Sequence, residues 1–262
     1  MDLQLVGKTA LITGSTKGIG RKIAECLASE GVRIIINGRN QEEVAQVAQT
    51  IADRYLVETV AAPFDLANPK ERMDLFALAP DIDILVNNAA IFEEKPIFKL
   101  LGTDLMRYLQ VNSLAAAALS QFYLPKLLKK NKDGRIIFIA SEAAIQPPKD
   151  MAHYAATKAY NLSFAKSLAM ETKGSSVTVN TVMPGPTYTE GIAEMLHNVL
   201  PDVHENLRES TYMRENRPSS SIQRFIRPEE IGQFVTFVAS PMAGAFSGEA
   251  LRMDGGMVPT IF

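Results

Sequence analysis

The sequence has few of the residues that build disulfides or metal sites. Its 262 residues include one cysteine, Cys26, and three widely separated histidines, His153, His197 and His204. A single cysteine excludes an internal disulfide and a thiolate metal cluster, and scattered histidines do not indicate a structural zinc site. We therefore expect a protein that uses no bound metal.

An excess of charge of one sign and long apolar runs are missing as well. Lys and Arg total 27 and Asp and Glu total 29, so the formal net charge is −2. A nucleic-acid platform would need clustered basic residues. No apolar run approaches the roughly 18 residues of a membrane span, and the N-terminus has neither the basic nor the apolar region of a signal peptide. We expect a cytoplasmic protein that binds neither nucleic acid nor membrane.

What the chain does contain is an alternation of short β-branched runs with longer helical stretches. Its length and its 47% of hydrophobic residues suit one large domain over residues 1–262. The apolar runs do not alternate with polar residues, which is typical of strands covered by helices on both faces. Strand–helix–strand repetition predicts parallel pairing through right-handed crossovers. The fold class is therefore α/β, a doubly wound parallel sheet, with strands expected at residues 9–13, 33–37, 59–62, 82–86, 135–139 and 176–180.

One segment, at about residues 188–227, interrupts this alternation. Apolar residues between positions 192 and 207 recur at helical spacing and predict one apolar helix face. Residues 218–221 then indicate a mobile loop. The segment is either a satellite helix packed on the domain or a lid over a pocket. Its loop position favours the lid, because ligands of open sheets bind beyond the carboxyl ends of the strands.

A glycine-rich turn joins the first expected strand to the first helix. Glycines permit a tight turn and let the backbone approach a pyrophosphate, and the helix N-terminus presents N–H groups and a partial positive charge to phosphate. The spacing is Gly-x-x-x-Gly-x-Gly and differs from the strict G-x-G-x-x-G pattern, but its place between a strand and a helix predicts a dinucleotide site. The expected cradle consists of Gly14, Ser15, Thr16, Lys17, Gly18, Ile19 and Gly20.

The end of the second expected strand distinguishes the two nicotinamide dinucleotides. An NAD site usually has an Asp or Glu there, which accepts a hydrogen bond from the ribose 2′-hydroxyl. This chain has Asn37, Gly38, Arg39 and Asn40. Arg39 and Lys17 of the glycine turn can pair with a 2′-phosphate, unless both are ordinary solvated cations. The missing acid and the two cations predict NADP(H).

Three residues with acid/base potential follow the fifth expected strand. Ser141 comes directly after it, and Tyr154 and Lys158 are four residues apart, so they share one helix face. A tyrosine has a pKa near 10 and must lose roughly 3 units to act at neutral pH, and a nearby ammonium lowers its pKa by stabilising phenolate. The pair predicts a general acid/base, although a half-buried tyrosine beside a surface lysine has the same spacing.

Together these features resemble the short-chain dehydrogenase/reductase family over nearly the whole chain, including the 13-residue step from Ser141 to Tyr154. The resemblance implies a Rossmann-type sheet of about seven strands. It also implies an oxidoreductase that transfers a hydride between NADP(H) and a carbonyl or secondary alcohol. The matching positions are residues 13–20, Asp65, Leu66, residues 87–90, Asn112, Ser141, Tyr154, Lys158, Pro184, Gly185 and residues 254–256.

The resemblance assigns roles to four catalytic candidates. Tyr154 would protonate the carbonyl oxygen during reduction, and Ser141 would hydrogen-bond the same oxygen. Lys158 would bind the nicotinamide ribose and lower the pKa of Tyr154. Asn112 would hold a water that links Lys158 to solvent.

Further cofactor contacts are implied at the ends of other strands. Asp65 and Leu66 would contact adenine, and Asn88 would approach the adenosine ribose. Thr187 would reach the nicotinamide carboxamide or the diphosphate. For Asp65, capping of the helix that begins near residue 69 is the alternative.

The substrate is not decided by these patterns. Among family members, 3-oxoacyl-carrier-protein reductases are a natural comparison, but they typically have an arginine before the sixth strand that docks the acidic carrier, where this chain has Ser175 and Ser176. The 188–227 segment is also longer than in compact members. His153 either faces substrate or covers a helix start. For Glu142, an exposed surface carboxylate is favoured over a specificity residue.

The leading hypothesis is an NADPH-dependent reductase of a small ketone, an oxoacyl compound or a hydroxylated metabolite. The alternatives are an oxidative dehydrogenase of steroids or polyols and a nonenzymatic NADP(H)-responsive binding protein. The complete set of Asn112, Ser141, Tyr154 and Lys158 disfavours the binding protein. The resemblance further implies a homo-oligomer, a dimer or tetramer, that uses long helices at about residues 104–130 and 152–173 and the C-terminal strand.

Overall fold

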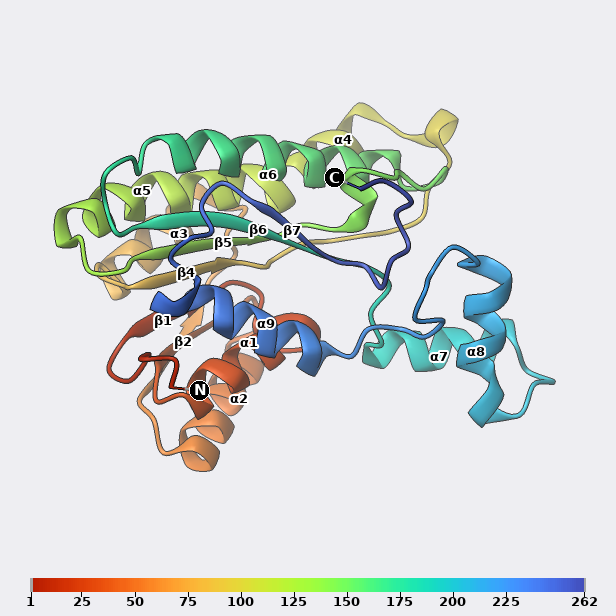
Figure 1. The fold of residues 1–262 in the computed structure, drawn as a ribbon, viewed down its shortest axis with the longest axis horizontal. Coiled ribbons are helices and arrows are strands. Elements are labelled where there is room, and N and C mark those ends of the chain that lie inside the picture. Colours follow the sequence, from red (N-terminus) through yellow and green to blue (C-terminus); the bar gives the residue numbers. More distant parts are fainter. Residues whose placement is uncertain (1, 262) are drawn as a thin grey trace.

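The computed structural model describes residues 2–261 and contains a seven-stranded sheet (Figure 1). The strand order is β3-β2-β1-β4-β5-β6-β7, and all neighbouring strands are parallel. The predicted doubly wound parallel fold is thereby confirmed. The order reverses between β1 and β4, and in such sheets ligands bind at this point, beyond the carboxyl ends of the strands. The strands are β1 (Thr9–Ile12), β2 (Arg33–Gly38), β3 (Thr59–Pro63), β4 (Ile84–Asn87), β5 (Arg135–Ile139), β6 (Thr178–Pro184) and β7 (Ala250–Met253).

Helices cover both faces of the sheet (Figure 1). One face carries α1, α2 and α9, and the other carries α3, α5 and α6. Two further helices, α7 and α8, extend beyond the end of the sheet. The helices are α1 (Gly18–Ser29), α2 (Gln41–Tyr55), α3 (Pro69–Leu78), α4 (Gly102–Leu109), α5 (Ala115–Lys130), α6 (Ala152–Met170), α7 (Glu190–Val199), α8 (Glu205–Asn216) and α9 (Pro228–Ala239).

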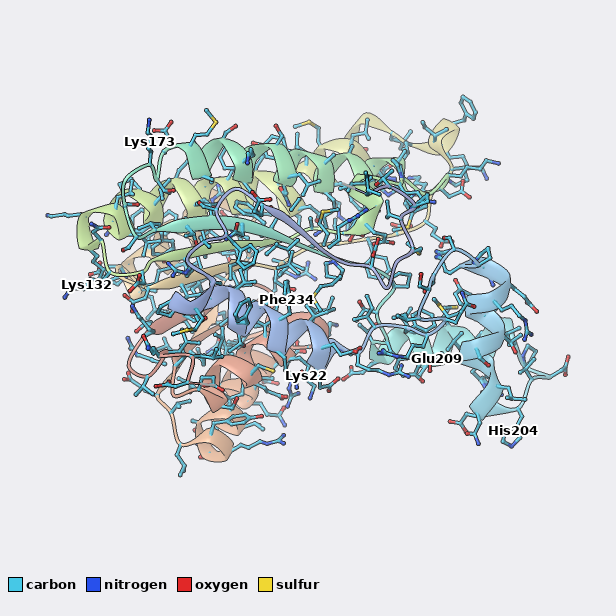
Figure 2. The ribbon with its side chains drawn as sticks, in the orientation of Figure 1. Lys22, Lys132, Lys173, His204, Glu209 and Phe234 are labelled. Atoms are coloured by element: carbon cyan, nitrogen blue, oxygen red, sulfur yellow. The ribbon has the colours of Figure 1, made fainter. Side chains whose placement is uncertain are left out.

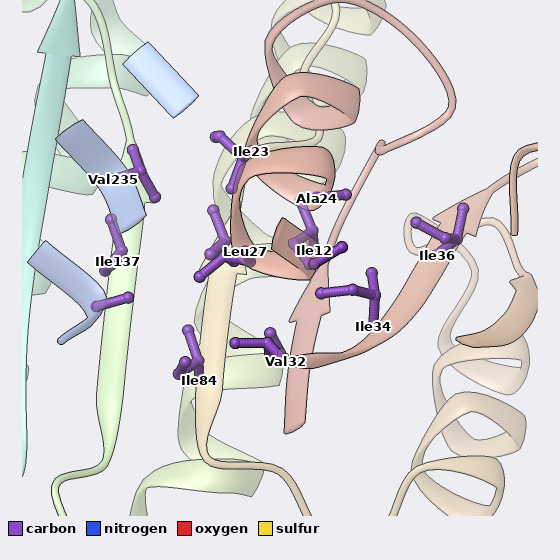
Figure 3. Close-up of a cluster of buried hydrophobic side chains, with 14 of the residues drawn as sticks. Ile12, Ile23, Ala24, Leu27, Val32, Ile34, Ile36, Ile84, Ile137 and Val235 are labelled. Carbon is purple, nitrogen blue, oxygen red and sulfur yellow. The ribbon is translucent and has the colours of Figure 1, made fainter. Parts of the chain in front are cut away.

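The core consists of two apolar layers, one on each side of the sheet. Side chains alternate between the two faces along a strand, so each β-branched run supplies both layers. On the first face, buried isoleucines from four strands pack against α1 and α9, with Leu27 and Val235 among their neighbours (Figure 3). On the second face, Leu75, Tyr123 and Leu168 cover the sheet from α3, α5 and α6. Because both faces are covered, the strands need no polar alternation.

A single helix over residues 104–130 was expected, and here the structure differs. Residues Gln110–Leu114 form one π-helical turn between α4 and α5. The π turn contains Asn112, whose side chain is buried. Such turns insert one residue into a helix and occur frequently at functional sites.

The 188–227 segment leaves and re-enters the sheet through a short paired neck. Thr187 and Ile226 form a parallel bridge, and the Tyr188 N–H donates to the Ile226 carbonyl at 2.8 Å. Beyond the neck, Leu196, Met213 and Phe225 form a separate small apolar cluster. Figure 2 shows His204 at the outer end of this segment and Glu209 closer to the neck.

The prediction of one helix face from residue 192 to residue 207 is wrong. The structure has two helices, α7 and α8, and the chain between them contains Pro201. Proline has no N–H group and clashes with the preceding helical turn, so it interrupts a helix. Of the predicted apolar face, Leu196 is buried, whereas Val199 and Leu207 are more than half exposed. No helix within residues 2–261 is long and apolar enough to cross a membrane.

Candidate active site

A cleft of about 460 Å³ lies beyond the carboxyl ends of the strands, next to the glycine turn. It extends from the N-terminus of α1 to Tyr154 and Lys158 on α6. The cleft therefore joins the predicted cofactor turn to the predicted catalytic pair. The predicted residues that line it are Gly14, Thr16, Lys17, Ile19, Gly20, Arg39, Asp65, Leu66, Asn88, Tyr154 and Lys158.

The glycines of the turn have different physical reasons to be glycine. Gly20 has no room for a side chain, because a Cβ there would lie 2.4 Å from the Asn88 amide nitrogen. Gly14 has φ +61, and a Cβ there would lie 3.0 Å from the Cα of Ala89. Gly18 has φ +57 and is more open, with the Thr189 side chain 3.8 Å from the position of a Cβ. The turn thus packs against the end of β4 and leaves the start of α1 accessible.

This start of α1 fits a phosphate group. Among the described residues, no side chain caps the helix at Lys17, and its first turn has no acidic residue. Uncapped N–H groups and the helix dipole favour an anion at this end. Together with the cleft beside it, the turn fits the diphosphate of a nicotinamide dinucleotide.

The end of β2 has the polarity that was expected from the sequence. Lys17 and Arg39 line the same cleft. The Asn37 amide donates to the carbonyls of Ala62 and Phe64 at 2.9 and 3.1 Å, and its oxygen accepts from Gly14 N–H at 3.3 Å. Asn37 thus ties β2, the chain at the end of β3 and the glycine turn together, and Lys17 and Arg39 are the two basic residues that line this end of the cleft.

The catalytic candidates come together where the C-terminal end of β5 meets the N-terminal end of α6. Lys158 is 3% exposed, and its ammonium donates to the Ile139 carbonyl at 2.8 Å. The same nitrogen lies 5.4 Å from the centre of the Tyr154 ring. The polar Ser141 side chain acts on the same phenol and lowers the pKa of Tyr154 against the larger effect of burial. Ser141, Tyr154 and Lys158 therefore form one cluster.

The expected lowering of the Tyr154 pKa by Lys158 is not what the structure gives. Burial is the largest effect on Tyr154, and the Glu142 carboxylate adds to it, so the pKa of Tyr154 rises above its usual value. Burial also lowers the pKa of Lys158, to about 8. Lys158 is not among the causes that shift the pKa of Tyr154, which are burial, Glu142 and Ser141. This geometry keeps Tyr154 in the protonated form, the form that donates a proton to a carbonyl oxygen.

Asn112 lies behind this cluster, in the π turn. Its side-chain oxygen accepts from Ile91 N–H at 2.8 Å, and its amide donates to the Ile91 carbonyl at 3.0 Å and to Thr157 Oγ1 at 3.1 Å. Its backbone carbonyl accepts a hydrogen bond from Asn161 Nδ2 at 2.9 Å. These contacts tie the π turn to Ile91 and to α6, and the role of Asn112 in holding a water stays a prediction.

Several predicted residues lie beside the cleft without lining it. Ser15 is buried, and its hydroxyl donates to the Ile12 carbonyl at 2.8 Å. Thr187 is in the neck, and its hydroxyl donates to the Gly185 carbonyl at 2.9 Å. Thr189, two residues later, lines the cleft and was not predicted. Its position at the N-cap of α7 is the signal that could have found it.

The structure decides between the alternatives that the sequence left open for Asp65 and His153. Asp65 lines the cleft, and the N-cap of α3 is Asn68, so Asp65 is not the helix cap. His153 is 3% exposed and packs edge-on against Tyr108, with ring centres 4.3 Å apart. It therefore covers the start of α6 and does not face the cleft.

The interpretation of Glu142 as an exposed surface carboxylate is wrong. Glu142 is partly buried, and the Ser141 hydroxyl donates to its Oε2 at 2.5 Å. Burial raises the pKa of Glu142. Sequence reasoning missed this contact because no periodicity shows which side of a short turn is covered by other parts of the fold.

The fold and the cleft define a class of protein, and comparison with known families agrees. The short chain dehydrogenase family model matches residues 8–199, so the chain belongs to this family of oxidoreductases. Members use nicotinamide cofactors, in agreement with the glycine turn and the cleft described above.

Individual relatives narrow the comparison. The chain is 49% identical to the uncharacterized oxidoreductase YvaG of Bacillus subtilis, with all of both chains aligned. It is 34% identical to the 3-oxoacyl-[acyl-carrier-protein] reductase FabG of Aquifex aeolicus, over 98% of this chain and 100% of the relative. Among solved structures, L-sorbose reductase from Gluconobacter frateurii, in complex with NADPH and L-sorbose, superposes with a TM-score of 0.91 at 29% identity, with both chains fully covered.

Proposed function

We propose that the protein is an NADP(H)-dependent oxidoreductase that reduces the carbonyl group of a small molecule to an alcohol. The observation that carries the proposal is the single cleft that has Lys17 and Arg39 near one end and Tyr154 and Lys158 at the other. The family relationship and the NADPH-bound sorbose reductase support it.

Each residue of the catalytic cluster has a task in this reaction. NADPH, held by the glycine turn, Lys17 and Arg39, would supply the hydride for the carbonyl carbon. Tyr154, whose raised pKa keeps it protonated, gives its proton to the carbonyl oxygen. Ser141 stabilises the negative charge that develops on that oxygen. Lys158, held by the Ile139 carbonyl, binds the ribose of the nicotinamide and supports proton return to Tyr154.

The direction of the reaction follows from the same acid/base balance. Oxidation of an alcohol would need Tyr154 as a phenolate, which burial and Glu142 disfavour. Reduction needs the neutral phenol. We therefore propose reduction as the working direction at neutral pH.

The proposal is tested by turnover of a panel of carbonyl compounds with NADPH and with NADH. We expect kcat/KM to be higher with NADPH. Replacing Arg39 with Ala should reduce kcat/KM for NADPH by about 10- to 100-fold and leave NADH nearly unchanged, because one charge-assisted contact to the 2′-phosphate is lost. Arg54→Ala, at the exposed far end of α2, is the matched control.

The outcomes distinguish the alternatives. A higher kcat/KM with NADH would contradict the NADP(H) assignment. Tight NADPH binding without turnover of any carbonyl would favour a nonenzymatic binding protein. Turnover confined to alcohol oxidation would favour the oxidative dehydrogenase.

We also propose a homo-oligomer, a dimer or tetramer. Large apolar side chains on and before α4 are exposed in the single chain, among them Phe98, Leu101 and Met106. Burial of such side chains by a second copy would be favourable. Light scattering at assay concentration should report a mass above that of one chain, and a monomer would contradict this proposal.

A further inference from the structure

The hydrogen atom of the Ser141 hydroxyl is already used inside the protein. It is donated to Glu142 Oε2 at 2.5 Å, and the Ser141 oxygen accepts a hydrogen bond from Ala143 N–H at 3.2 Å. A hydroxyl has one hydrogen to donate. While it points to Glu142, Ser141 cannot also donate to a substrate carbonyl oxygen. For Ser141 to donate to the carbonyl oxygen, its hydrogen bond to Glu142 must break. The Glu142 carboxylate must then accept a hydrogen bond from another donor or remain without that bond.

Glu142 has few other donors. No Lys or Arg within residues 2–261 forms an ion pair with it, and the nearest influence of positive charge comes from Arg217 at the end of α8. The backbone N–H groups of Glu142 and Ala143 help to keep its pKa from rising further. A partly buried carboxylate that loses its Ser141 contact without a replacement would be strongly disfavoured.

We propose that Glu142 is a specificity residue that accepts a hydrogen bond from a substrate hydroxyl on the carbon next to the reacting carbonyl. The preferred substrates are then hydroxy ketones and hydroxy aldehydes. This inference rests on the proposed reductase function. It adds a substrate class that neither the glycine turn nor the tyrosine–lysine pair specifies.

The geometry favours this class because one substrate can supply both hydrogen-bond partners: its hydroxyl donates to Glu142, and its carbonyl oxygen accepts from Ser141. Oxygens on neighbouring carbons lie about one hydrogen-bond length apart, which is also the separation between Ser141 Oγ and Glu142 Oε2. The substrate hydroxyl donates to Glu142 in place of Ser141, and the released Ser141 hydrogen turns to the carbonyl oxygen. The number of hydrogen bonds is conserved, and the carboxylate stays paired.

A simple ketone or a 3-oxoacyl thioester has no hydroxyl at that carbon. It must either leave Ser141 bound to Glu142, without help for the carbonyl oxygen, or leave the carboxylate with only the backbone N–H groups of Glu142 and Ala143 as donors. Sites built around a buried polar group reject analogues that lack its partner. We expect a penalty of about 10- to 100-fold in kcat/KM.

The test uses matched substrate pairs: hydroxyacetone and acetone, acetoin and butanone, and a ketohexose and its 1-deoxy analogue. Each pair is assayed with NADPH on the wild-type protein, on Glu142→Ala and on Glu142→Gln. The control is Glu171→Gln, an exposed carboxylate at the opposite end of α6 from Tyr154. The measured quantity is the ratio of kcat/KM values within each pair.

The wild-type protein and the control should prefer the hydroxylated member by about 10-fold or more in at least one pair. Glu142→Ala should reduce this ratio toward one, through a loss for the hydroxylated member and an unchanged or higher rate for the simple ketone. Glu142→Gln should retain an intermediate ratio, because its amide oxygen still accepts a hydrogen bond.

Three results would overturn the inference. A ratio near one in the wild-type protein would exclude recognition of the hydroxyl. An equal loss for both members in Glu142→Ala would make Glu142 a residue that only positions Ser141. Turnover of aldehydes or oxoacyl compounds without turnover of any hydroxylated member would exclude the substrate class. No turnover of any carbonyl compound would instead refute the proposed function itself.

Discussion

The sheet with its covering helices, residues 2–187 and 228–261, and the 188–227 segment are stabilised by different interactions. The sheet and its helices bury continuous apolar layers on both faces, in which side chains such as Ile34, Ile137 and Leu27 have no exposed surface (Figure 3). The 188–227 segment has a small cluster around Leu196, Met213 and Phe225. A large core holds the glycine turn and Tyr154 in place, whereas a small core can open at low cost.

The two regions also differ in the burial and pairing of their charged residues. The sheet region buries Lys158 without an acidic partner. Around the 188–227 segment, Arg227 pairs with Glu209 at 2.7 Å and Arg224 pairs with Glu230 at 2.8 Å, and all four side chains are partly exposed. The buried Lys158 therefore lowers stability at the proposed catalytic site. The ion pairs at the neck are partly exposed and contribute little to stability.

The largest expected effect tests whether the chemistry belongs to the sheet region. Tyr154→Phe removes the proton donor, and kcat should fall by about 10²- to 10⁴-fold. NADPH affinity, measured by fluorescence titration, and the free energy of unfolding should stay close to wild type. Tyr160→Phe, on the same helix and stacked on Phe164, is the control and should keep its activity. Near-normal turnover of Tyr154→Phe would place the proton donor elsewhere.

Core truncations test the difference in packing directly. Leu27→Ala should lower the free energy of global unfolding by about 2–5 kcal/mol, since it creates a cavity in the large core. Leu196→Ala should lower it by about 1 kcal/mol or less and should accelerate hydrogen exchange in α7 and α8, because the small cluster opens locally. Denaturant unfolding and hydrogen exchange measure the two effects. Equal losses would show that the 188–227 segment unfolds together with the sheet.

A substitution of the buried Lys158 tests how much the candidate site lowers the free energy of unfolding. Burial lowers the pKa of Lys158 from 10.5 to about 8 in the folded protein, so the unfolded chain binds its proton more tightly. The resulting penalty is complete below pH 8 and disappears as pH rises to about 10.5. Lys158→Met should therefore abolish turnover and raise the free energy of unfolding by about 1–3 kcal/mol at pH 7. A variant less stable than wild type at pH 7 would contradict this account.

The smallest effect is expected at the neck. The hydrogen bond from Arg224 is the main cause that lowers the pKa of Glu230, to about 2. Its stabilisation is complete above the ordinary pKa of 4.5 and is lost as pH falls toward 2. Because the pair is exposed, Glu230→Gln should cost about 1 kcal/mol or less at pH 7, and this difference should vanish near pH 2. Thermal unfolding of both proteins between these pH values measures it, and a difference that persists at pH 2 would implicate packing.

Local patterns predicted the elements whose formation depends on nearby residues. β5 occupies residues 135–139 as expected, because its β-branched run reads as a strand without further context. The expectation of one helix between residues 192 and 207 failed at Pro201, a residue whose effect is also local. The π turn at Asn112 had no local signal, and the partners of the Asn112 side chain, residues 91 and 157, are far from it in the sequence.

Some features of the candidate site could also be predicted from the sequence, whereas others depend on the tertiary structure. The glycine turn, Arg39 and the Tyr154–Lys158 spacing are readable in the sequence because each uses residues close together along the chain. Their meeting in one cleft follows from the strand order, which reverses between β1 and β4. The raised pKa of Tyr154 was not predictable, because burial and Glu142 outweigh the expected effect of Lys158.

The sequence by itself therefore determined the parallel α/β fold, the family and the residues that can bind a phosphate or move a proton. Only the tertiary structure decided that Glu142 is partly buried against Ser141, that Lys158 is enclosed, and that the 188–227 segment has a core of its own. The physical reason is that side-chain chemistry is set by residue type, whereas burial and the dielectric environment are set by what packs over a side chain.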